Sequence, residues 1–402
     1  MTSTWQNSFA QLKEFINDHP SIEISANCVS IPSDVRPEFY RRFDSVRTDF
    51  LKDNFPSSLE KGYELSKEFA KVYTAAIAAG NLEAINIRAA INWFLQEPAN
   101  GLMRSLFDPV FNLIRGKLTE QTFTDNSIQL IDDAFSDYFR NGYEYWVVLG
   151  LLSRLQLDKN YHIDSHDFHT DSEVSGGATS PGMREEAIDA IKDSKEISFD
   201  GSNMTAFIVP RTLFHTQRLG CYMAIHTDLS EAWWRARGKS ERMEWLNIKE
   251  LTKEFGRSRL WPDLMVYTAE NVEDLNLVAD CYWVARPDLI VEIEENDGWY
   301  ERGGIELARR HIAALKPRLG CFIICRTAPP AEAYDEIAAK SIAPQGQGPS
   351  QESLSDGSNP SVVVSQANSE PAIHIIHAGY DLERLDSIME ALKAEKLAPE
   401  GK

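Results

Sequence analysis

The chain is short of basic residues and of cysteines. Its 402 residues include 61 acidic but only 41 basic side chains, giving a formal net charge of −20. This charge repels nucleic acid over the general surface, so any contact with nucleic acid requires a local concentration of basic groups. The five cysteines lack the close spacing of a disulfide framework or a zinc knuckle. We expect a cytoplasmic protein, with Cys321 and Cys325 in its core.

Long apolar runs and nucleotide-binding glycine motifs are also missing. The longest apolar run, Tyr145 to Leu152, is far shorter than the roughly 20 residues needed to cross a bilayer. The first residues show neither the basic segment nor the apolar stretch of a secretory signal. The lack of a Gly-rich phosphate loop and of a nucleophile-elbow serine argues against nucleotide-driven and serine-hydrolase chemistry. A soluble protein with no membrane partner is therefore predicted, and its apolar content of 43% is ample for packed cores.

Helical periodicity dominates the first part of the chain. Phe9, Leu12, Phe15 and Ile16 form one apolar stripe that stops before Pro20. Further helices are predicted over 57–80, 82–96, 128–139 and 143–157. We expect residues 1–157 to form an all-helical domain that recognises the target or a protein partner.

A polar stretch separates this helical part from the rest. Residues 158–182 are rich in polar residues and glycine, and we interpret them as a linker or long loop. Metal-ligating residue types occur here, namely His162, Asp164, His166, Asp167, His169 and Asp171. A dedicated metal site needs rigid neighbours that this stretch does not offer, so a solvated loop is the favoured interpretation.

The remainder, 183–402, mixes strand and helix patterns. Helices are predicted at 181–195, 229–243, 247–256, 302–316 and 382–397. Strands are predicted at 206–210, 221–226, 263–268, 279–284, 288–294, 320–325 and 373–377. Residues 343–372 are rich in Ser, Gln, Pro and Gly, which predicts a disordered insertion. The fold class expected for the whole chain is α+β, a helical domain followed by a mixed sheet flanked by helices.

The predicted strand 288–294 carries the most informative pattern. Leu289, Val291 and Ile293 share one face of this strand and point into a core. Asp288, Ile290, Glu292 and Glu294 share the opposite face, which therefore carries three carboxylates. The outer face of a solvated edge strand would show the same pattern, so the acids need a further partner to indicate a site.

A hairpin would supply that partner. If residues 285–287 form a three-residue loop, Val284 pairs with Asp288, and Asp280 lies opposite Glu292. Directly opposed Cβ atoms are about 4.5–5.5 Å apart, and two carboxylates that close repel each other unless a proton or a cation intervenes. Mg²⁺ prefers oxygen ligands and commonly takes one or two protein carboxylates. The pattern therefore predicts a Mg²⁺ or Mn²⁺ site.

The order of an acid, a hairpin, Glu-x-Glu on a strand, a helix and a strand resembles the PD-(D/E)xK nuclease superfamily over residues 280–326. By this resemblance Asp280 takes the place of the family Asp and Glu292 that of the acid in the triplet. Glu294 stands where Lys is usual, although some restriction endonucleases of the superfamily carry Glu-x-Glu. Asp288, which follows Pro287, is the alternative to Asp280. The implied metal ligands are Asp280, Glu292 and Asp288, and the implied catalytic residues are Asp280, Glu292 and Glu294.

The resemblance implies a metal-dependent endonuclease that hydrolyses phosphodiester bonds of nucleic acid, with DNA favoured and with restriction or defence as its setting. Metal ions would lower the pKa of a bound water, and Glu294 would act as general base. A further acid on a preceding helix, Glu185 or Glu186, is not singled out by any pattern. Basic residues follow the acids and are either solvated or in contact with a nucleic-acid backbone, namely Arg302, Arg309, Arg310, Lys316 and Arg318.

Two other functions stay open. A nuclease-like fold without catalysis would serve as a protein interaction or regulatory module, which the net charge and the missing Lys favour. A helical assembly protein whose second domain is only a scaffold is the third hypothesis.

Overall fold

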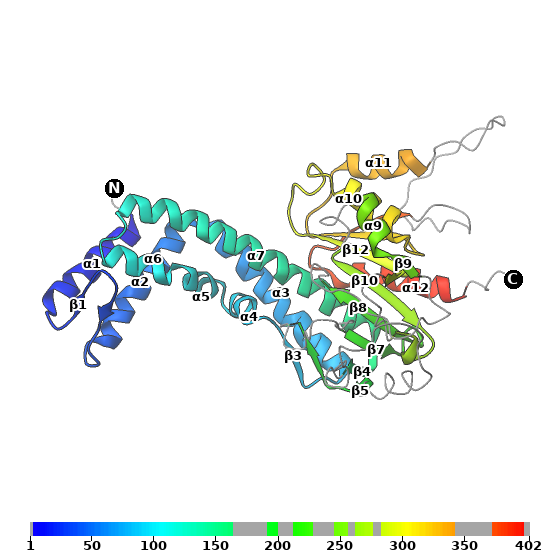
Figure 1. Cartoon of the computed structure of the whole chain (residues 1–402), viewed down its shortest axis with the longest axis horizontal. Coiled ribbons are helices and arrows are strands. Elements are labelled where there is room, and N and C mark those ends of the chain that lie inside the picture. The colour runs from blue at the N-terminus through cyan, green and yellow to red at the C-terminus, as the bar shows by residue number, and fades with distance from the viewer. Residues whose placement is uncertain are drawn as a thin grey trace. The chain divides into compact units, whose positions relative to one another are not determined.

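The computed structural model describes residues 3–163, 191–199, 212–227, 245–255, 262–275, 283–341 and 372–397. The chain divides into two compact units, one within 1–74 and 87–146, the other within 75–86 and 147–402. The division near 146 falls before the boundary that the sequence placed at 157. The fold class is α+β, as predicted, with a helical region followed by a mixed eight-stranded sheet and interspersed helices (Figure 1).

The first unit is built from amphipathic helices. They are α1 (Thr4–Asp18), α2 (Arg36–Asn54), α3 (Pro56–Gly80), α4 (Ala89–Gln96), α5 (Pro98–Met103), the 3₁₀ turn η1 (Arg104–Leu106), α6 (Phe107–Ile114) and α7 (Glu120–Leu155). A short hairpin of β1 (Glu23–Ile24) and β2 (Val29–Ser30) follows α1. The apolar stripe predicted for α1 is buried, and Phe39, Phe43 and Phe50 of α2 are fully buried. The unit boundary falls within α3 and within α7.

Two helix predictions in this region were wrong. The predicted helix 82–96 begins with a strand, β3 (Ala84–Asn86), and only α4 is helical. The predicted helices 128–139 and 143–157 are one helix, α7. A Cβ on Gly142 would lie 2.9 Å from Leu65 and 3.0 Å from Leu95, so this glycine lets α7 pack closely within the first unit.

The second unit is organised around the eight-stranded sheet, ordered β14-β13-β12-β10-β8-β7-β4-β5. Its strands are β4 (Leu157–Ile163), β5 (Ile191–Asp193), β7 (Thr212–Thr216), β8 (Cys221–Thr227), β10 (Leu264–Ala269), β12 (Leu289–Glu294), β13 (Cys321–Cys325) and β14 (Ile373–His377). Strands β12, β13 and β14 are parallel, and the other neighbouring pairs are antiparallel.

Smaller elements complete the unit. Strand β3 pairs with β6 (Glu196–Ser198), and β9 (Trp245–Asn247) pairs with β11 (Trp283–Ala285). The helices are α9 (Ile248–Phe255), α10 (Gly304–Leu315), α11 (Ala331–Ser341) and α12 (Asp386–Leu397), with 3₁₀ turns η4 (Val272–Leu275) and η5 (Leu382–Leu385).

The predicted linker 158–182 was wrong at its start, because 158–163 belong to β4 and pair with β7 and β5. Its remaining residues, 164–182, lie outside the described residues. The predicted helix 181–195 was also wrong where it is described, because 191–193 form β5. The predicted strand 206–210, the predicted helix 229–243 and nearly all of the insertion 343–372 lie outside the described residues.

One face of the central strands is covered by α10. Met265 of β10, Ile290 of β12 and Ile323 of β13 pack in one core with Ala308 and Leu315 of α10. Cys321 and Cys325 lie in the same core, fully buried and free of disulfides, as expected from the sequence. Because side chains alternate along a strand, Glu292 and Glu294 lie on the face of β12 that carries Ile290.

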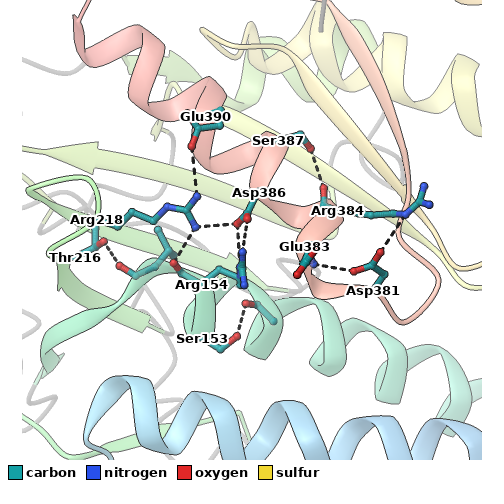
Figure 2. Close-up of polar contacts among 12 residues, drawn as sticks. Ser153, Arg154, Thr216, Arg218, Asp381, Glu383, Arg384, Asp386, Ser387 and Glu390 are labelled. Atoms are coloured by element: carbon teal, nitrogen blue, oxygen red, sulfur yellow. Dashed lines mark hydrogen bonds and ion pairs between the residues drawn. The ribbon is translucent and has the colours of Figure 1, made fainter. Parts of the chain in front are cut away.

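A cluster of ion pairs attaches α12 to its neighbours within the second unit (Figure 2). The guanidinium of Arg154, near the end of α7, binds both carboxylate oxygens of Asp386, the first residue of α12. Arg218, in the turn between β7 and β8, donates to the same carboxylate over 2.8 Å and to the carbonyl oxygen of Arg154 over 3.2 Å. These contacts fix where α12 begins.

Candidate functional site

The predicted hairpin before β12 does not form. Strand β11 pairs with β9, with Val284 opposite Leu246, and not with β12. Both edges of β12 are taken by other strands, β10 on one side and β13 on the other. The prediction that Val284 pairs with Asp288 was therefore wrong, and the argument that set Asp280 opposite Glu292 fails with it. Asp280 itself lies outside the described residues.

The acid that lies beside Glu292 is Asp263. Strand β10 runs antiparallel to β12 with Leu264 opposite Val291, so the residue before β10 comes level with Glu292. The Oδ2 atom of Asp263 accepts the backbone N–H of Ile293 over 2.6 Å. At the end of the ladder between β10 and β12, the carboxylate of Asp263 thus accepts an N–H that a backbone carbonyl would otherwise accept. This hydrogen bond holds Asp263 next to Glu292.

Sequence reasoning missed Asp263 although a signal was present. Pro262 and Asp263 form a Pro-Asp pair directly before an apolar strand. The chain has a second Pro-Asp pair at Pro287 and Asp288, which the sequence offered as the alternative to Asp280. Only the pairing of β10 with β12 distinguishes the two, and that pairing is a tertiary property.

Glu292 forms a buried pair with a histidine of α10. The distance from His311 Nδ1 to Glu292 Oε1 is 2.5 Å, and the two side chains are 1% and 5% exposed. Burial raises the pKa of Glu292 well above its ordinary value. His311 was also missed, but it lies three residues after the buried Ala308 and four before the buried Leu315, on the buried stripe of an amphipathic helix.

Glu294 lies two residues further along the same face and is partly exposed. Its pKa is raised to about 7, mainly by burial and then by the charges of Glu295 and Glu292, while Arg302 acts in the opposite direction. A carboxyl group with this pKa exchanges a proton near neutral pH, which suits a general base.

Asp288 has a structural role instead. It is 3% exposed, and its Oδ2 accepts the backbone N–H and the hydroxyl of Thr268, each over 2.6 Å. Its Oδ1 accepts two N–H groups of the Arg318 guanidinium. With both oxygens engaged by protein donors, Asp288 is not offered to a metal ion as the sequence had proposed.

Two of the five basic residues after β12 are engaged with acids that the structure describes. Arg309 binds Glu336 and approaches Glu306 at 3.6 Å, and Arg318 binds Asp288. Arg302 and Lys316 are exposed, and Arg310 is partly buried. The alternative helix acids, Glu185 and Glu186, lie outside the described residues.

The described side chains around Glu292 offer few ligands for a divalent cation. Within the described ranges, no group of three or more His, Cys, Asp or Glu side chains is placed to hold a metal ion. Two carboxylates and water are nevertheless a common Mg²⁺ set. Asp263 and Glu292 supply two such groups on neighbouring strands, and in the described part of the chain Glu292 makes no hydrogen bond through Oε2. The oxygen chemistry therefore fits a cation bound by two acids.

Comparisons with known proteins add no assignment. No family model, no curated protein and no solved structure matches the chain. Among the residues described here, no helix combines the length and the apolar character needed to span a membrane.

Proposed function

We propose that the second unit is a metal-dependent nuclease that hydrolyses phosphodiester bonds of nucleic acid, with Asp263, Glu292 and Glu294 as its carboxyl groups. The observation that carries this proposal is the pairing of β10 with β12, which sets Asp263 level with Glu292. The order of a Pro-Asp pair, Glu-x-Glu on the next strand of the sheet, helix α10 and strand β13 then agrees with the resemblance to the PD-(D/E)xK superfamily.

Each residue has a distinct proposed role. Asp263 and Glu292 would hold Mg²⁺ or Mn²⁺, whose charge polarises a phosphodiester and lowers the pKa of a bound water. Glu294 would accept the proton of the attacking water, since its pKa of about 7 makes it a base near neutrality. Arg302, the exposed cation whose charge acts on Glu294, would contact the phosphate backbone.

The net charge of −20 limits the substrate contact to such local basic groups. We propose DNA as the substrate and the cytoplasm as the compartment. A protein partner or the target nucleic acid would bind to the helical unit.

The second candidate is a nuclease-like module without catalysis that binds or regulates another protein. Two observations favour it, the acid at Glu294 where the superfamily usually has Lys and the deep burial of the Glu292–His311 pair. A buried pair of this kind can give a core its specificity without any catalytic chemistry. The two candidates differ in whether Asp263 and Glu292 are required for cleavage.

The test is a cleavage assay with the full-length chain. Plasmid DNA, a single-stranded oligonucleotide and RNA are incubated with Mg²⁺, with Mn²⁺ or with EDTA. We expect cation-dependent cleavage that falls by about 100-fold or more in Asp263→Asn and Glu292→Gln. Asp335→Asn, which neutralises an exposed acid on α11, is the matched control and should cleave as the wild type does. Equal cleavage by wild type and Asp263→Asn, or none by the wild type, would exclude the nuclease.

A further inference from the structure

We infer that His311 is a positioning residue of this site, which holds Oε1 of Glu292 and leaves Oε2 for a cation bound jointly with Asp263. The inference rests on the proposed function and adds the residue on which cation affinity depends. It begins from the contact of His311 Nδ1 with Glu292 Oε1, which links α10 to β12 at 2.5 Å.

The protonation of the pair follows from what a cation requires. A carboxylate that binds a cation is ionised and can only accept hydrogen bonds, so Nδ1 of His311 must carry the proton and donate it. Such a charge-assisted bond between two buried groups fixes the orientation of the carboxylate. Carboxylates that bind metals are commonly held in this way by a second group, and removing that group typically costs 10–100-fold in metal affinity.

The two acids are held in matching ways. Asp263 Oδ2 accepts a backbone N–H, that of Ile293, while Glu292 Oε1 accepts the side chain of His311. The backbone donor cannot be removed by a substitution, whereas the histidine can. His311 is therefore the point at which the positioning of the acids can be tested without altering an acid.

Filling of the core is the competing role for His311. The side chain is 1% exposed and lies among residues packed beneath α10, so any substitution affects stability. The two roles predict opposite orders for two variants. His311→Phe fills the site with a slightly larger apolar ring and removes the donor, whereas His311→Asn keeps an N–H donor close to the Nδ1 position and leaves a cavity.

The experiment measures Mn²⁺ affinity of the full-length chain from the electron paramagnetic resonance signal of free Mn²⁺, together with the unfolding midpoint without metal. We expect His311→Phe to weaken Mn²⁺ binding about tenfold or more and His311→Asn to stay within about threefold of the wild type. We also expect His311→Asn to be the less stable variant. If His311→Phe does not fold, His311→Met takes its place as a side chain without an N–H.

Two outcomes would overturn the inference. The first is that His311→Phe binds Mn²⁺ as tightly as the wild type does. The second is that the more stable variant binds Mn²⁺ more tightly, so that His311→Phe has a higher Mn²⁺ affinity than His311→Asn. The proposed function fails separately, if the wild type binds no Mn²⁺ or if Glu292→Gln binds it equally well. If the wild type binds Mn²⁺ and cleaves DNA, and His311→Phe has the same Mn²⁺ affinity, only the role of His311 is excluded.

Discussion

Two groups of acids in the second unit differ in whether nearby positive charge balances their negative charge. Asp386 is bound by Arg154 and Arg218 (Figure 2), and the hydrogen bond from Arg154, above all, holds its pKa below the ordinary value. Glu292 and Glu294 on β12 have the opposite environment, since burial raises the pKa of both. The same chemical group is therefore stabilised as an anion at α12 and destabilised as an anion on β12.

This difference separates a structural acid from a candidate functional one. An acid whose charge is fully met by arginine contributes to folding and has little left to offer a ligand. The raised pKa values of Glu292 and Glu294 come first from burial, and shifted pKa values in neighbouring carboxyls are frequent at catalytic and metal-binding positions. Asp288 is the informative exception. It lies beside β12 but resembles Asp386 in being bound by an arginine, and it also accepts two hydrogen bonds from Thr268.

The largest effect should come from removing Asp288. In Asp288→Ala the backbone N–H and hydroxyl of Thr268 lose their acceptor in a partly buried place, and Arg318 loses its partner. Each unsatisfied buried donor costs about 1–3 kcal/mol, so we expect a loss of about 2–4 kcal/mol in the free energy of unfolding. Urea unfolding at pH 7 in EDTA measures it.

Arg318→Ala is the control for this prediction. The Arg318 side chain is 46% exposed, so its removal should cost about 1 kcal/mol or less. If Asp288→Ala unfolds within about 0.5 kcal/mol of the wild type, Asp288 is not a structural anchor and returns as a candidate metal ligand.

Much of the sheet could be predicted from the sequence because its strands and helices have local signals. Short apolar runs marked β10, β12 and β13 to within one or two residues, and the 3.6-residue stripe marked α10. The face shared by Glu292 and Glu294 follows from the period of two along a strand. These features depend only on neighbours in the chain.

Strand pairing could not be predicted in this way. The hairpin argument assumed that consecutive strands pair, but β11 pairs with β9 and leaves β12 to β10. The partner acid therefore changed from Asp280 to Asp263. His311 was unrecognised for the same reason, because a histidine on a buried helical stripe acquires a role only when the sheet sets an acid beneath it.

The free energy of unfolding, measured over a range of pH, tests the raised pKa of Glu294. Its pKa of about 7 in the folded chain exceeds the ordinary 4.5, so the folded state binds the proton more tightly than the unfolded state does. The associated stability is fully present below pH 4.5 and is lost as the pH rises through about 7. A shift of this size corresponds to up to roughly 3 kcal/mol, measured by urea unfolding in EDTA between pH 4.5 and 8.

Glu294→Gln should remove this decrease of the unfolding free energy with rising pH. Glu306→Gln, at an exposed acid of α10, should keep it. Saturating Mg²⁺ should also flatten the slope by favouring the ionised site, as expected for a ligand that binds only the folded state. An unchanged slope in Glu294→Gln would show that the burial of this acid has no energetic consequence.

The smallest effect on stability is expected at Asp386, where the dependence on pH is opposite to that at Glu294. Its pKa is lowered in the folded chain, chiefly by the hydrogen bond from Arg154, so its stabilisation is present above the ordinary value of 3.8 and is lost as the pH falls through the folded pKa. The side chain is 28% exposed, which screens the ion pairs. Asp386→Asn should therefore lower the free energy of unfolding by about 1 kcal/mol at pH 7 and by less in high salt. It should have no effect at low pH, where Asp386 is protonated in both the folded and the unfolded state.

Glu383→Gln, at an exposed acid of η5, is the matched control and should unfold as the wild type does at every pH. Asp386→Asn should also leave DNA cleavage and Mn²⁺ affinity unchanged, because its charge is met by arginines and not by a ligand. A loss of Mn²⁺ binding in Asp386→Asn would break the distinction between the two groups of acids. It would mean that the start of α12 controls the β12 site, and that a carboxyl with a lowered pKa can serve function as directly as one with a raised pKa.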